Sequence, residues 1–170
     1  PQVQHRHLHV FRRENFGEPL ESVCLALRDL ANRYDDRIQL VYPVHRNPNV
    51  WGPVHQLLGN VPNIRLLPPL DYLLNLHLMQ RSYLVITDSG GIQEEATILK
   101  RPLLVVRRSN ERPEAEQAFG SRTLPGDDGI SRTLVTWLRD AQAISARLAN
   151  IPTPFGDGTA SSHVVQALHS

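Results

Sequence analysis

Residues 83–99 read YLVITDSGGIQEEATIL, and this stretch decides the fold. The apolar run at 83–86 is typical of a strand that is buried on both faces. The segment Asp88-Ser89-Gly90-Gly91 then forms a turn, and a helix is predicted from about Gly91 to Leu99. A strand, a glycine-rich turn and a helix in this order form one unit of a parallel α/β sheet.

The same alternation of strands and helices continues on both sides of this unit. Further strands are predicted at 38–42, 64–67 and 103–106, with a first strand ending at Val10, and helices at 18–34, from Asn47-Pro48 to Leu58, and at 71–79, 113–118, 130–148 and 160–168. This pattern predicts a Rossmann-like α/β fold, a parallel sheet with helices on both faces. At this length one domain is expected, and its ligands should bind in the loops beyond the carboxyl ends of the strands.

Composition excludes several classes of partner. The formal charge is +1, from 18 basic and 17 acidic residues, which predicts no binding to nucleic acid. No apolar run approaches the roughly 20 residues that span a bilayer, so no membrane partner is expected. The one cysteine, Cys24, falls in a predicted helix, which excludes an internal disulfide and fits a cytoplasmic location. The first residue is Pro1, which suggests a piece of a longer chain.

Three histidines, His5, His7 and His9, alternate along the first strand. A metal site is one interpretation of this spacing. We favour the other, an edge strand that tolerates polar residues, because no carboxylate or cysteine accompanies the histidines. No metal is therefore expected.

The turn at 88–91 is a candidate phosphate site. It ends a strand and opens a helix, so backbone N–H groups and the positive helix end lie at the ligand edge of the sheet. Gly90 and Gly91 let a diphosphate approach the backbone, and Ser89 adds a hydroxyl donor. Glu95 leans back toward the helix start and could bind a ribose diol. The alternative is that Ser89 only caps the helix, the glycines only make the turn and Glu95 is solvated.

Other motifs are excluded or absent. The segment 88–91 is similar to the nucleophile segment of trypsin-like serine proteases, but those enzymes are antiparallel barrels. The sequence contains no G-x-G-x-x-G, no Walker G-x-x-x-x-G-K and no H-E-x-x-H. We therefore expect no nicotinamide, ATP or zinc cofactor.

Six segments, in this order and spacing, resemble the carboxyl half of the bacterial non-hydrolysing UDP-N-acetylglucosamine 2-epimerase family. They are RRENFG at 12–17, VYPVH at 41–45, NPNV at 47–50, DSGGIQEEA at 88–96, ERPE at 111–114 and FGDG at 155–158. The resemblance implies the two-domain GT-B architecture, with a UDP-sugar bound between two Rossmann-like halves. Residues 1–170 would be the second half, a single UDP-binding domain, and the N-terminal domain would be its missing partner. Family members tend to dimerise, so a homodimer is a further candidate.

The resemblance also implies roles for individual residues. Ser89, Gly90 and Gly91 would hold the diphosphate, and Glu95 the ribose hydroxyls. Arg112 would contact a phosphate oxygen, where a guanidinium can neutralise charge as UDP leaves. The alternative for Arg112, taken from the residues alone, is a surface ion pair with its neighbours Glu111 or Glu114.

Two further sites are implied by the resemblance. Leu70 to Leu73, including Tyr72, resemble the segment that contacts uracil; the family often has an aromatic residue where this chain has Asn75, so base stacking would be weaker here. Arg12 and His45 match residues near a second UDP-N-acetylglucosamine that acts as an activator in bacterial members. His45 could equally be a loop histidine that only bonds the backbone.

One departure from the family pattern concerns catalysis. The family has a histidine immediately before the paired arginines, whereas this chain has Phe11. Phenylalanine removes a hydrogen-bond donor and any proton transfer at that position. Catalysis by this chain, even with a partner domain, is therefore in question.

The family reaction, by resemblance, is an anti elimination of UDP from UDP-N-acetylglucosamine to 2-acetamidoglucal. Re-addition with inversion at C2 then gives UDP-N-acetylmannosamine, without a redox cofactor or metal. The main hypothesis is the nucleotide-binding half of this isomerase, inactive by itself. The alternatives are a non-catalytic UDP-sugar-binding module and the donor-binding half of a GT-B glycosyltransferase.

Overall fold

The computed structural model describes residues 6–11, 17–34, 37–125 and 129–169. Its sheet has six strands in the order β3-β2-β1-β4-β5-β6. The strands are β1 (Arg6–Phe11), β2 (Ile38–Pro43), β3 (Ile64–Leu67), β4 (Leu84–Thr87), β5 (Leu103–Val106) and β6 (Gly120–Thr123). Every neighbouring pair is parallel. The predicted parallel α/β fold is confirmed.

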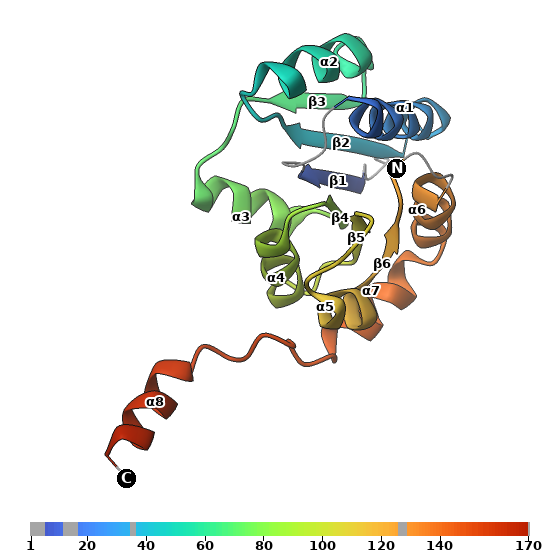
Figure 1. Ribbon diagram of the computed structural model, residues 1–170. Coiled ribbons are helices and arrows are strands. Elements are labelled where there is room, and N and C mark those ends of the chain that lie inside the picture. The colour runs from blue at the N-terminus through green and yellow to red at the C-terminus, as the bar shows by residue number, and fades with distance from the viewer. Residues whose placement is uncertain (1–5, 12–16, 35–36, 126–128, 170) are drawn as a thin grey trace.

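Helices cover both faces of this sheet (Figure 1). They are α1 (Glu18–Arg33), α2 (Pro48–Leu58), α3 (Tyr72–Arg81), α4 (Gly90–Ile98), α5 (Pro113–Phe119), α6 (Gly129–Arg139), α7 (Ala141–Ala149) and α8 (Ala160–Leu168). Buried residues of α1, α2 and α6 form one core with the sheet. Buried residues of α3, α4, α5 and α7 form a second core on the opposite face. None of the described helices is long and apolar enough to cross a membrane.

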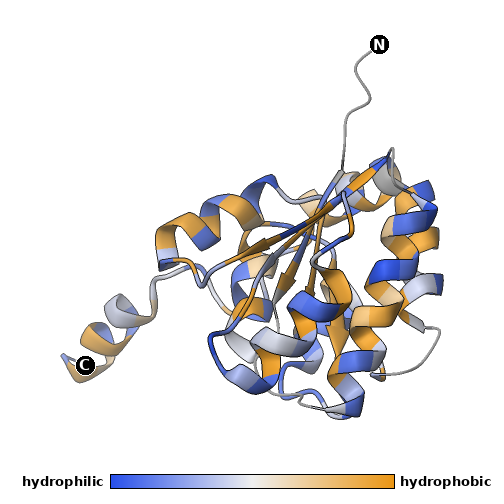
Figure 2. Cartoon of the chain, turned by 90° about the horizontal axis from the view of Figure 1, so that it is seen from above, coloured by the Kyte–Doolittle hydropathy of each residue, from blue (hydrophilic) through white to orange (hydrophobic). Residues whose placement is uncertain are grey.

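The central strands supply side chains to both cores in turn. In β4, Leu84 and Ile86 belong to the core under α1, while Val85 belongs to the core under α4. Successive side chains of a strand point to opposite faces, so a strand covered on both sides is apolar at most positions. All four residues of β4 are buried, and orange, apolar strand segments lie between the helices in Figure 2. The apolar run at 83–86 therefore correctly predicts a strand that is buried on both faces.

Two helices begin at residues whose side chains accept hydrogen bonds from the first turn. The Asp71 carboxylate accepts a hydrogen bond from the backbone N–H of Leu74 at 2.9 Å and so begins α3. The Asn47 side chain accepts one from the N–H of Asn49 at 3.0 Å, with Pro48 in the first turn of α2. Local chemistry thus fixes both boundaries.

The predicted helix at 130–148 is wrong as a single element, because α6 ends at Arg139 and α7 begins at Ala141. The reason lies in packing on two faces. Leu134 of α6 belongs to the core under α1, whereas Leu148 of α7 belongs to the core under α4. One straight helix cannot bury residues against both faces of the sheet, so the chain breaks between them.

Two further features were missed or misplaced. The strand β6, with the sequence GSRT, carries no strand pattern of its own and forms by pairing with β5. The first strand is not at the edge: β1 lies between β2 and β4, and His9 is fully buried. His5 lies outside the described residues, and His7 is exposed.

The last helix lies apart from the sheet, after an extended segment (Figure 1). It has no buried residue, and its apolar residues Val164, Val165 and Leu168 are more than half exposed.

The chain that follows α7 is held in place by Lys100, which lies just beyond the end of α4. Lys100 bonds the carbonyl oxygen of Ile151 and lies 5.4 Å from the centre of the Phe119 ring, which holds the chain after α7 against α4 and α5.

Candidate functional site

The strand order places the candidate phosphate turn at the point where the sheet changes direction. The chain runs from β1 to α1 on one face and from β4 to α4 on the other, and β1 and β4 are neighbours. In open parallel sheets, ligands bind at the carboxyl ends of the two strands that diverge in this way. Phe11 is the last residue of β1 and pairs with Thr87, the last residue of β4. The segment 88–91 begins at the next residue.

The turn is fixed from inside by the strand that precedes it. Thr87 and Asp88 are fully buried. The Thr87 hydroxyl oxygen accepts a hydrogen bond from the backbone N–H of Ser89 at 3.0 Å. Ser89 is the N-cap residue of α4, but its side chain makes no capping hydrogen bond. The alternative in which Ser89 only caps the helix therefore has no support in this geometry.

Gly90 and Gly91 form the first turn of α4, and the protein's own structure does not require glycine at either position. Neither has a positive φ angle. A Cβ atom added at either would have no neighbouring heavy atom within 4 Å. Alanine would stabilise a helix at these positions, since glycine costs about 0.5–1 kcal/mol relative to it. The open space above the glycines lies where the first N–H groups of α4 have no acceptor within the helix.

Two polar residues of α4, Gln93 and Glu95, follow the turn. Glu95 follows Gly91 by one helical turn and is half-buried. Gln93 is fully buried, and its side-chain amide has no hydrogen-bond partner in the described part of the chain. A buried amide without a partner is costly, so Gln93 is a residue of interest that the sequence reasoning did not single out. The only sequence signal was a polar residue on the inner side of a helix.

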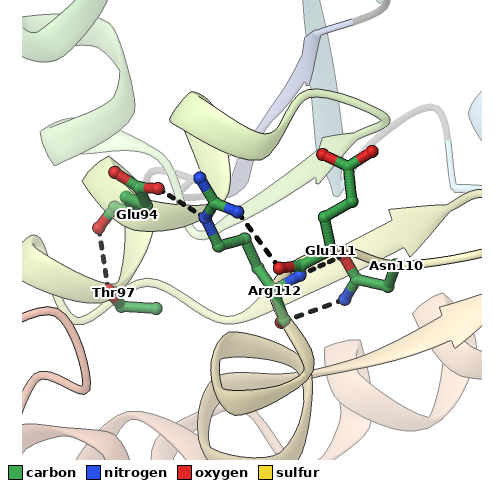
Figure 3. A network of polar contacts seen from close by, with 5 residues as sticks. All are labelled: Glu94, Thr97, Asn110, Glu111 and Arg112. Carbon is green, nitrogen blue, oxygen red and sulfur yellow. Dashed lines mark hydrogen bonds and ion pairs between the residues drawn. The ribbon is translucent and has the colours of Figure 1, made fainter.

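Arg112 pairs with a residue that was not predicted. Its Nε atom lies 2.5 Å from Oε1 of Glu94, on α4. Its contact with Glu111 runs through the backbone carbonyl, to which Nη1 donates at 3.1 Å. Figure 3 shows the guanidinium between these two acceptors, with the Glu111 carboxylate turned away. The alternative predicted an ion pair with Glu111 or Glu114. It is right that Arg112 forms an ion pair but wrong about the partner, which is Glu94.

The electrostatics of this pair follow from its geometry. The hydrogen bond and the charge of Glu94 raise the pKa of Arg112 above its usual value, and the charges of Glu111 and Glu114 add smaller effects in the same direction. Arg112 is the N-cap residue of α5. A cation at the positive end of a helix is unfavourable unless an anion lies close by. Glu94 supplies that anion.

The backbone at Arg112 is held by its own loop. The Asn110 side chain accepts from the Arg112 N–H at 3.1 Å and donates to its carbonyl oxygen at 3.0 Å. The same amide donates to Glu116 at 3.0 Å, and Glu116 forms an ion pair with Arg122 of β6 at 3.3 Å. The start of α5 is therefore fixed to the edge of the sheet.

The other predicted residues lie at other strand ends. Leu70 is half-buried and Tyr72 is 61% exposed, both near the start of α3 after β3. His45 is exposed after β2, and its Nδ1 atom accepts a hydrogen bond from the N–H of Asn47 at 3.2 Å. This is the backbone contact expected of a plain loop histidine. Arg12 lies outside the described residues.

Comparison with known proteins gives one consistent family. The family model described as UDP-N-acetylglucosamine 2-epimerase matches residues 5–169. The UDP-N-acetylglucosamine 2-epimerase of Escherichia coli strain K12 is 46% identical over 159 residues, which cover 92% of this chain and 42% of that protein. The chain therefore spans less than half the length of this relative.

Solved structures agree with the family model. The UDP-GlcNAc 2-epimerase from Neisseria meningitidis, bound to UDP-GlcNAc, has a TM-score of 0.87 and 36% identity, and covers 99% of this chain against 46% of its own. The S. aureus MnaA–UDP co-structure has a TM-score of 0.85 and 32% identity, and covers 96% of this chain and 44% of its own. The fold is that of one Rossmann-like half of the GT-B architecture.

Proposed function

Because the chain belongs to the UDP-N-acetylglucosamine 2-epimerase family, we propose that residues 1–170 are a single UDP-binding domain of an enzyme that interconverts UDP-N-acetylglucosamine and UDP-N-acetylmannosamine. The rest of such an enzyme would be an N-terminal domain, since the chain covers 42% of its relative from E. coli. The proposed location is the cytoplasm, and the proposed assembly is a homodimer of the whole protein.

The observation that carries the proposal is the pair Gly90-Gly91 at the start of α4. Nothing within the described chain requires glycine there, and the turn lies where β1 and β4 diverge. A ligand that approaches the backbone closely gives the two glycines a purpose, and the helix start selects an anion. A diphosphate on Gly90, Gly91 and Ser89 meets both conditions.

The remaining roles follow from position. Glu95, one turn further along α4, would accept hydrogen bonds from the ribose hydroxyls. Leu70 and Tyr72 would contact uracil from the loop after β3. Arg112 would neutralise the charge of UDP as the bond to the sugar breaks, and an interaction of this kind contributes most where charge develops in the transition state.

Calorimetric titration of the 170-residue chain with UDP tests the binding role. We expect micromolar to millimolar affinity, and a loss of at least about 1 kcal/mol in binding free energy for Glu95→Ala and for Arg112→Ala. Glu114→Gln is a matched control, because this exposed carboxylate lies near Arg112 without a hydrogen bond to it. Wild-type chain that fails to bind UDP would contradict the proposal.

Phe11 favours a second candidate, a UDP-sugar-binding module without catalysis. Phe11 is the last residue of β1 and pairs with Thr87. By the resemblance, the family has its active-site histidine at this position. The full-length protein with Phe11, compared with its Phe11→His variant, separates the two. Formation of UDP-N-acetylmannosamine or 2-acetamidoglucal by the natural protein supports the epimerase, and formation only by the variant supports the binding module. Transfer of the sugar to an alcohol would instead indicate a glycosyltransferase.

A further inference from the structure

Glu94 follows the candidate phosphate turn on α4 and pairs with Arg112, and neither the sequence pattern nor the comparisons give it a role. We propose that Glu94 is a positioning residue that holds the Arg112 guanidinium by its Nε edge and so presents its outer edge to the diphosphate of UDP. This inference rests on the proposed function of the site.

The geometry leaves the outer edge of the guanidinium available. Arginine has five N–H donors, and two of its nitrogens are engaged here. Nε donates to Glu94, and Nη1 donates to the carbonyl oxygen of Glu111. Nη2 makes no hydrogen bond within the described ranges, and the side chain is 37% exposed. Glu94 therefore orients the guanidinium and leaves Nη2 available to a ligand.

The position of Glu94 determines where that guanidinium lies. Glu94 is in the second turn of α4, three residues after Gly91. Side chains of a helix lean toward its N-terminus, so a partner of Glu94 is drawn toward the first turn of α4. Figure 3 shows Arg112 reaching from the start of α5 to the side chain of Glu94 on the neighbouring helix. The backbone of Glu94 is itself tied by Thr97, whose hydroxyl donates to its carbonyl oxygen at 2.8 Å.

Charge explains why an acid is used here. Arg112 lies at the N-terminus of α5, so its charge stands at a positive helix end. Glu94 is the closest compensating anion. When a diphosphate binds, its charge compensates the helix end and the outer edge of Arg112, while Glu94 keeps the inner edge.

The first test is UDP affinity in a double-mutant cycle. We expect Glu94→Ala and Arg112→Ala each to weaken UDP binding by about tenfold, and the double variant to be no weaker than Arg112→Ala. Glu94→Gln, whose amide oxygen can still accept from Nε, should restore most of the affinity. Uridine, which lacks phosphate, should bind the wild type and every one of these variants alike. Glu114→Gln, which removes a nearby charge without removing a hydrogen bond, should leave UDP affinity unchanged.

The outcomes separate this role from others. Tighter UDP binding by Glu94→Ala would show that Glu94 competes with the ligand, and would overturn the inference. Additive losses in the double variant would show that Glu94 acts independently of Arg112, and would overturn it as well. An equal loss of uridine binding would indicate damage to the fold and would count against a positioning role.

A second measurement needs no ligand. In ¹⁵N-edited NMR spectra, the Arg112 Nε–H resonance should be shifted and protected from solvent exchange in the wild type and in Glu94→Gln, and unprotected in Glu94→Ala. An unprotected resonance in the wild type would overturn the inference. If this signal is protected but no form binds UDP, the proposed function fails, and the role of Glu94 fails with it. If wild type binds UDP and Glu94→Ala binds equally well, only the role of Glu94 fails.

Discussion

The hydroxyl oxygen of Thr87 accepts a hydrogen bond from the backbone N–H of Ser89 at 3.0 Å, so the last residue of β4 holds the turn that follows it. Thr87→Val keeps the shape of the side chain and leaves this N–H without its acceptor. We expect a loss of about 1–3 kcal/mol in the free energy of unfolding, and weaker UDP binding as the turn loosens. Urea denaturation and calorimetry measure the two effects.

Thr136→Val is the matched control for this change. The Thr136 hydroxyl donates to the carbonyl oxygen of Arg132 within α6, on the other face of the sheet. The Thr136→Val substitution should not alter UDP affinity. Equal affinity for wild type and Thr87→Val would show that the turn does not depend on this hydrogen bond.

Gly91→Ala should separate stability from binding. The added Cβ has open space, and alanine favours the helix, so the free energy of unfolding should rise by about 0.5–1 kcal/mol. The same Cβ stands where the diphosphate approaches, so UDP affinity should fall by about tenfold or more. Thermal unfolding and calorimetry on the same sample provide the test. Unchanged affinity would mean that the ligand does not approach Gly91.

Gly120→Ala should have the opposite effect on stability. A Cβ at this position would lie 2.0 Å from the backbone oxygen of Leu103, where β6 pairs with β5. We expect a loss of about 3 kcal/mol in the free energy of unfolding, because backbone must move to relieve the clash. Gly52→Ala, with no atom near the added Cβ, is the control and should not destabilise the chain. If the two variants were equally stable in urea, the close contact between Gly120 and the Leu103 backbone would be refuted.

Acid should destabilise the chain through His9. Burial lowers the pKa of His9 from 6.5 to about 3, so the folded state keeps this ring neutral. Between these two values the unfolded chain binds the proton and the folded chain does not, so stability falls as the pH decreases. At pH 5 the loss relative to pH 7.5 should be about 2 kcal/mol from this group. Urea denaturation of wild type and His9→Leu at both values tests this, since the variant should lose that part of the pH dependence.

Much of the architecture could be predicted from local patterns. The apolar run before Asp88 predicts a strand, and Asp71 and Asn47-Pro48 predict helix starts, and the structure confirms all three positions. What failed depends on contacts between distant segments. The break at Asp140 follows from packing on both faces of the sheet, and β6 exists because Leu103 and Gly120 pair. No local pattern contains that information.

The candidate site shows the same division. The turn at 88–91 was identified from its glycines and from the helix that it opens. The Glu94–Arg112 pair joins residues from two helices, and the pattern around Arg112 offered only its neighbours Glu111 and Glu114 as partners. Choosing among three acids requires the positions of α4 and α5. The ligand-binding roles proposed for Ser89, Gly90, Gly91, Glu95, Arg112, Leu70, Tyr72 and His45 all remain predictions.

The central place of β1 also bears on how quickly the chain can fold. His9 pairs with Val41 on one side and with Val85 on the other, so the strand nearest the start of the described chain needs partners far along it. Closing such long loops costs entropy before any contact compensates for it, and parallel sheets with distant pairings fold slowly for this reason. Until β4 pairs with β1, the backbone groups along that edge of β1 are open to pairing with another chain, so early aggregation is a hazard of refolding.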